Sequence, residues 1–99
     1  MQRAEVLAWL QARRPAPPPA LSSHLEAAVR DLPLPLPDHL AALGAGLLDR
    51  VTAHAEGGRA LALDLLAADA FVTYGFEAQA EADVAGLRPL AERVARGSA

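Results

Sequence analysis

The residues best suited to chemistry lie in one stretch, LALDLLAADAFVTYGFEAQAEAD, residues 61–83. Four acids and the only tyrosine of the chain interrupt its apolar run: Asp64, Asp69, Tyr74, Glu77 and Glu81. Paired carboxylates can move a proton or bind a metal ion, and a tyrosine hydroxyl can donate a hydrogen bond. The positions of these side chains around the predicted helix decide between such chemistry and an ordinary solvent-exposed edge.

The apolar spacing predicts a helix from about residue 59 to 83. Each helical residue advances by about 100°, so Asp69, Thr73, Glu77 and Glu81 form one row of neighbours four residues apart. Asp69 and Glu77 are about 12 Å apart along the helix axis, too far to share one metal ion without help from another helix. The row therefore predicts the solvent face of this helix.

Asp64 is different because it lies about 140° away from that row. Its neighbours form a face of mostly small residues that would suit close helix packing: Ala68, Phe71, Gly75 and Ala78. An acid on this face is paired with an arginine or histidine, exposed, or used to bind a ligand. We favour a structural pair.

A binding pocket that combines Asp64, Tyr74 and His54 is the alternative, and it would make the protein a small-molecule binder or a minor enzyme. The sequence has no Gly-x-Ser-x-Gly, phosphate-binding or dinucleotide motif. It also lacks the Glu-x-x-His and His-Glu-x-x-His spacings of helical metal sites. We therefore predict no catalytic residues, no metal and no cofactor.

The composition favours an interaction protein. The apolar fraction is 53% and the charged fraction 21%, so part of the apolar surface is expected to face a partner. The net charge of −3 and the scattered arginines argue against nucleic-acid binding. No run of about 20 uncharged apolar residues predicts a membrane span. Absence of cysteine fits a reducing compartment, and the N-terminus makes a poor signal peptide, so we expect a cytoplasmic protein.

Helical periodicity recurs along the chain, and strand alternation is nearly absent, so we predict an all-α fold in a single domain over 1–99. The architecture is a compact bundle of four to five helices built on a long hairpin, about 38–56 and 59–83. Further helices are predicted at 3–14, from Ser23, and from Leu87 or Arg88. Both termini should fray.

Two local patterns refine this plan. Ser23 and Glu26 have the spacing of a capping box, which predicts a helix start at Ser23. The prolines of LPLPLP, residues 32–37, predict an extended polyproline-type crossover.

Gly44 and Gly46 would each cost the first hairpin helix about 1 kcal/mol, which close approach of a neighbouring backbone could offset. With Asp64, Ala68, Phe71, Gly75 and Ala78, they are the candidate interface residues. We predict a non-enzymatic protein that self-associates as a homodimer through these faces. A regulator that binds a larger protein would show the same sequence features. All nine basic residues are arginine in an alanine-rich chain, which suggests a high-GC bacterial genome.

Overall fold

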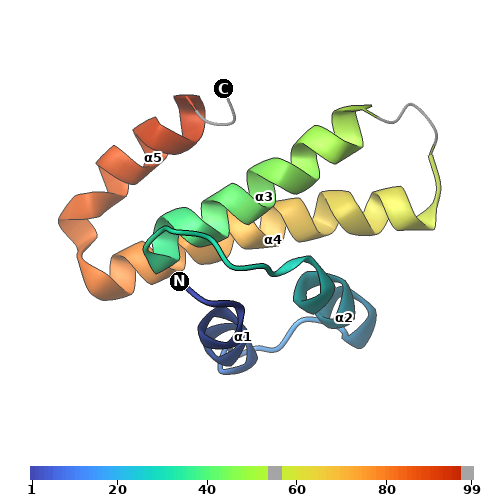
Figure 1. Ribbon diagram of the computed structural model, residues 1–99, viewed down its shortest axis with the longest axis horizontal. Helices are drawn as coiled ribbons and strands as arrows, with labels where there is room; N and C mark the ends of the chain where they lie inside the picture. The colour runs from blue at the N-terminus through green and yellow to red at the C-terminus, as the bar shows by residue number, and fades with distance from the viewer. Residues whose placement is uncertain (54–56, 97–99) are drawn as a thin grey trace.

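The structure is a computed structural model that describes residues 1–53 and 57–96 (Figure 1). Its helices are α1 (Arg3–Gln11), α2 (Pro19–Ala28), α3 (Leu36–Ala53), α4 (Arg59–Ala82) and α5 (Leu87–Arg96), with a short 3-10 helix, η1 (Val84–Gly86), before α5. No strand occurs in these described ranges. The predicted all-α bundle and its long hairpin, now α3 and α4, are confirmed.

The two hairpin helices approach each other closely at two glycines. A Cβ atom at Gly44 would lie 2.9 Å from the backbone oxygen of Ala68 and 2.9 Å from Cγ2 of Val72. A Cβ atom at Gly75 would lie 3.0 Å from the backbone oxygen of Pro37. Real Cβ contacts are longer than 2.9 Å, so only glycine fits at Gly44 without a shift of the neighbouring atoms, and at Gly75 a Cβ atom would be in a tight contact.

Gly46 does not take part in this contact. It is exposed, and a Cβ atom there would meet only Nη2 of Arg30, at 3.9 Å. The predicted backbone approach is therefore found at Gly44 and is wrong for Gly46.

The main core is built where α1 and α2 cover the hairpin (Figure 1). Its large, fully buried side chains include Phe71, Leu40, Leu43 and Val6. Leu25 of α2 joins the same cluster. Because Phe71 is the only fully buried aromatic side chain among the described residues, the rest of this core is made of aliphatic residues.

The N-terminal helices differ from their predicted bounds. α1 ends at Gln11, and the guanidinium groups beyond it donate to its last carbonyls, Arg13 Nε to Trp9 O at 3.2 Å and Arg14 Nη1 to Gln11 O at 2.9 Å. α2 begins at Pro19, so the predicted start at Ser23 is wrong. Proline suits a first turn because its missing N–H would have no helical partner there.

The crossover from α2 to α3 covers residues 29–35 instead of the predicted 32–37, because α2 ends at Ala28 and α3 already begins at Leu36, with Pro37 in its first turn. The N-terminus lies along this crossover. Leu32 N donates to Met1 O at 3.2 Å, and Arg3 Nε donates to Val29 O at 2.9 Å. These bonds oppose the fraying predicted for the N-terminus, while residues 97–99 lie outside the described ranges.

α5 begins at Leu87 as predicted and lies at the opposite end of the hairpin from the α3–α4 connection (Figure 1). Leu90 is its buried residue. Arg93 donates to Asp38 of α3 through Nε at 2.8 Å and Nη2 at 3.2 Å. A two-pronged ion pair therefore attaches this helix to α3. Within the described part of the chain, no helix is both long and apolar enough to span a bilayer.

We predict opposite effects on stability when each of the two glycines of α3 is replaced by alanine. Gly44→Ala should lower the free energy of unfolding by about 1–3 kcal/mol, because the new methyl group overpacks the contact with α4. Gly46→Ala is the matched control and should raise it by up to about 1 kcal/mol through helix propensity alone. Urea titrations followed by circular dichroism measure both, and equal effects at the two positions would contradict the close approach.

Candidate functional site

Asp64 is the buried acid of α4, with 7% of its surface exposed. Its Oδ1 atom lies 2.5 Å from Nε2 of His24 on α2 and 3.6 Å from Nη1 of Arg50 on α3. One carboxylate thus joins three helices. This is the structural pair favoured by the sequence, and it leaves the carboxylate engaged in holding α2 and α3 rather than facing an open cavity.

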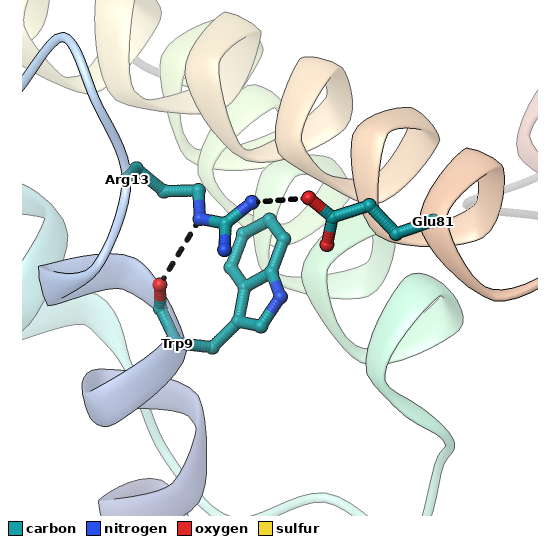
Figure 2. Close-up of polar contacts among 3 residues, drawn as sticks. All are labelled: Trp9, Arg13 and Glu81. Carbon is teal, nitrogen blue, oxygen red and sulfur yellow. Dashed lines mark hydrogen bonds and ion pairs between the residues drawn. The ribbon is translucent and has the colours of Figure 1, made fainter.

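Tyr74, ten residues and nearly three turns further along α4, belongs to an aromatic cluster with α1. Its ring packs edge-on against Trp9, with the centroids 6.0 Å apart and the planes at 81°. Figure 2 shows the guanidinium of Arg13 between the Trp9 ring and Glu81. The Arg13 Cζ atom is 3.8 Å from the ring centroid, and Nη1 is 2.7 Å from Glu81 Oε2. The ion pair therefore attaches the end of α1 to the end of α4, and the cation–π contact holds Arg13 over Trp9 of α1.

The predicted row of polar residues is on the solvent side. Asp69, Thr73, Glu77 and Glu81 are all exposed. Glu81 also forms the ion pair with Arg13, a contact that the sequence did not predict because the two residues are 68 positions apart.

A surface groove of about 290 Å³ separates this row from the α1–α2 connection. Its polar lining balances Arg13 and Arg14 against Asp69 and Glu77. Tyr74 also lines this groove. Burial raises the pKa of its hydroxyl, and the nearby Glu77 carboxylate raises it further. The Tyr74 hydroxyl therefore keeps its proton at neutral pH.

The alternative pocket predicted from Asp64, Tyr74 and His54 is not assembled by the described residues. Asp64 and Tyr74 are about 15 Å apart along α4. Tyr74 lines the groove beside Arg14 and a small cavity beside Leu10, and Asp64 lines neither of them. His54 lies outside the described residues.

The other candidate interface residues lie mainly inside the chain. Ala68, Phe71, Gly75 and Ala78 are buried, as is Gly44. The small-residue faces therefore lie inside the chain, where they contribute to the contact of α3 with α4 and to the core.

His39 is a buried polar residue that the sequence did not single out. Its side chain is fully buried at the start of α3, and Nε2 lies 2.8 Å from the carbonyl oxygen of Arg30, so Nε2 carries the proton. Nδ1 is buried without a hydrogen-bond partner among the described residues. Burial lowers the pKa of His39, an effect that the Arg30 carbonyl partly offsets. This neutral imidazole joins the crossover to α3.

Across residues 1–53 and 57–96, no three His, Asp or Glu side chains converge as metal ligands would. No protein family, curated protein sequence or solved structure in our comparisons matches the chain.

Replacing Asp64 tests the three-helix junction. Asp64→Ala should lower the free energy of unfolding by roughly 2 kcal/mol, because a hydrogen bond to a charged group is lost and His24 keeps no acceptor. Asp49→Ala, at an exposed position of α3, gains the same helix propensity and should change stability by at most about 0.5 kcal/mol. Denaturant titration compares the two, and equal losses would refute the buried junction.

His39 should make the fold sensitive to mild acid. Its pKa is lower in the folded chain than its ordinary value of 6.5, so below that pH the unfolded chain binds the proton more readily. The free energy of unfolding should therefore fall from pH 7 to pH 5. In His39→Gln, which keeps a donor for the Arg30 carbonyl, this slope should flatten. Urea titrations at pH 7 and pH 5 measure the change in the free energy of unfolding for both proteins. Because both proteins contain His24, an equal change in the two would exclude His39 as its cause.

Proposed function

We propose that the protein is a small non-enzymatic interaction protein that forms a homodimer through the outer face of α4. The observation that carries the proposal is the exposure of two adjacent leucines, Leu65 at 51% and Leu66 at 54%. The small-residue faces are already used inside the chain, so these leucines are the apolar surface that remains for a partner on α4. Burying a leucine is favourable by roughly 1.5–3 kcal/mol.

The surroundings of the leucines support an apolar contact. A shallow groove beside them is lined by apolar side chains and glycines: Val51, Gly57, Gly58, Leu61, Ala62 and Leu65. The start of α4 projects at the end of the hairpin that is far from α5 (Figure 1). α5 therefore does not cover the start of α4.

The chemistry of the described residues supports a binding role over catalysis. Asp64 is held by His24 and Arg50, and the Tyr74 groove has balanced charges. A contact surface needs neither an activated nucleophile nor a perturbed acid. The exposed leucines supply the apolar area that such a surface uses.

Sedimentation equilibrium tests the proposal. The wild-type chain should give twice the monomer mass of 10.3 kDa at micromolar concentration. Leu65→Ser combined with Leu66→Ser should give the monomer mass while keeping the helical circular dichroism spectrum. Leu48→Ser, which changes a leucine on α3 that is 46% exposed, is the matched control and should remain dimeric. A monomeric wild-type chain would overturn the proposal.

A further inference from the structure

The outer face of α4 carries a seam of residues spaced alternately by four and three positions. Its members are Ala62, Leu66, Asp69, Thr73, Phe76 and Ala80. Five of them are exposed, and Phe76 is partly buried. This heptad spacing is the pattern by which one helix packs along another. The seam follows one face of α4 for about 27 Å.

The rest of the molecule leaves this seam uncovered along most of its length. α3 packs on the side of α4 that carries Ala68 and Gly75. α2 and α1 bind the sides that carry Asp64 and Tyr74. The seam lies on the side that these three helices leave free, together with the exposed Leu65, while η1 and α5 also contact α4.

We infer that a second copy of this chain occupies the seam, with the two α4 helices antiparallel and their two-fold axis level with Phe71. The inference rests on the proposed self-association and specifies its geometry. Read in opposite directions, the seam matches itself: Ala62 faces Ala80 of the second copy, and Leu66 faces Phe76 of the second copy. Small residues meet at the two ends, and large apolar residues meet between them and the centre.

The polar residues favour the antiparallel direction. Asp69 faces Thr73 of the second copy, so each threonine hydroxyl can donate to a carboxylate across the axis. Near the ends, the exposed Arg59 faces the exposed Asp83 of the second copy. A parallel pairing in register would instead place Asp69 against Asp69 and Arg59 against Arg59. Like charges in contact would oppose that arrangement.

Disulfide cross-linking tests the register, because the natural chain contains no cysteine. Ala62→Cys and Ala80→Cys are prepared as separate proteins, and both replace exposed alanines on α4. After oxidation, a mixture of the two should give a covalent heterodimer on a non-reducing gel. Each variant alone should stay uncross-linked, since like positions are about 27 Å apart in the antiparallel pair.

Ala82→Cys is the matched control. Ala82 is also exposed and lies two residues from Ala80, but it points to the opposite side of α4. Its mixture with Ala62→Cys should give no heterodimer. Circular dichroism checks that each variant is helical.

Three results would overturn the inference in distinguishable ways. Cross-linking of Ala62→Cys with itself would show a parallel or differently centred pair. A sedimentation dimer without the Ala62–Ala80 cross-link would reject this register and leave the proposed self-association standing. A wild-type monomer in sedimentation would reject both.

Discussion

The close approach of α3 and α4 at Gly44 and Gly75 is the constraint on which the rest of the structure depends. At these points a neighbouring backbone oxygen occupies the space that a Cβ atom would need. The short spacing lets a chain with few aromatic residues bury Phe71 and Leu40 in one core. It also fixes the rotation of α4, which directs Asp64 toward His24 of α2 and turns the leucines of the opposite side to solvent.

The remaining elements attach to this hairpin by separate contacts of mixed chemistry. Trp9 and Arg13 bind α1 to α4 through an aromatic pair, a cation–π contact and the ion pair with Glu81. The buried imidazole of His39 ties the crossover to α3, and the Asp38–Arg93 pair holds α5. Exposed ion pairs contribute little individually, so the aliphatic core must supply most of the stability.

The sequence predicted the helices well where apolar spacing was long and regular, as in α3 and α4. It also indicated that Asp64 needs a partner, because its angular position set it apart from the solvent row. It did not identify His24 as that partner, since the residues are 40 positions apart and only the packing of α2 joins them. The start of α2 was misplaced because Pro19 provides a first turn without the Ser23 cap. Gly44 and Gly46 look alike in the sequence. Only the structure distinguishes them, because Gly44 lies against α4 and Gly46 is exposed.

We expect the α3–α4 contact to form the stable unit on which the other helices depend. Native-state amide hydrogen exchange measures this, because it reports the free energy of opening at each residue. Amides of α3 near Gly44 and of α4 near Phe71 should exchange only through global unfolding. Amides of α5 should exchange through a smaller opening that leaves the hairpin intact. Stronger protection in α5 than around Gly44 would contradict the account.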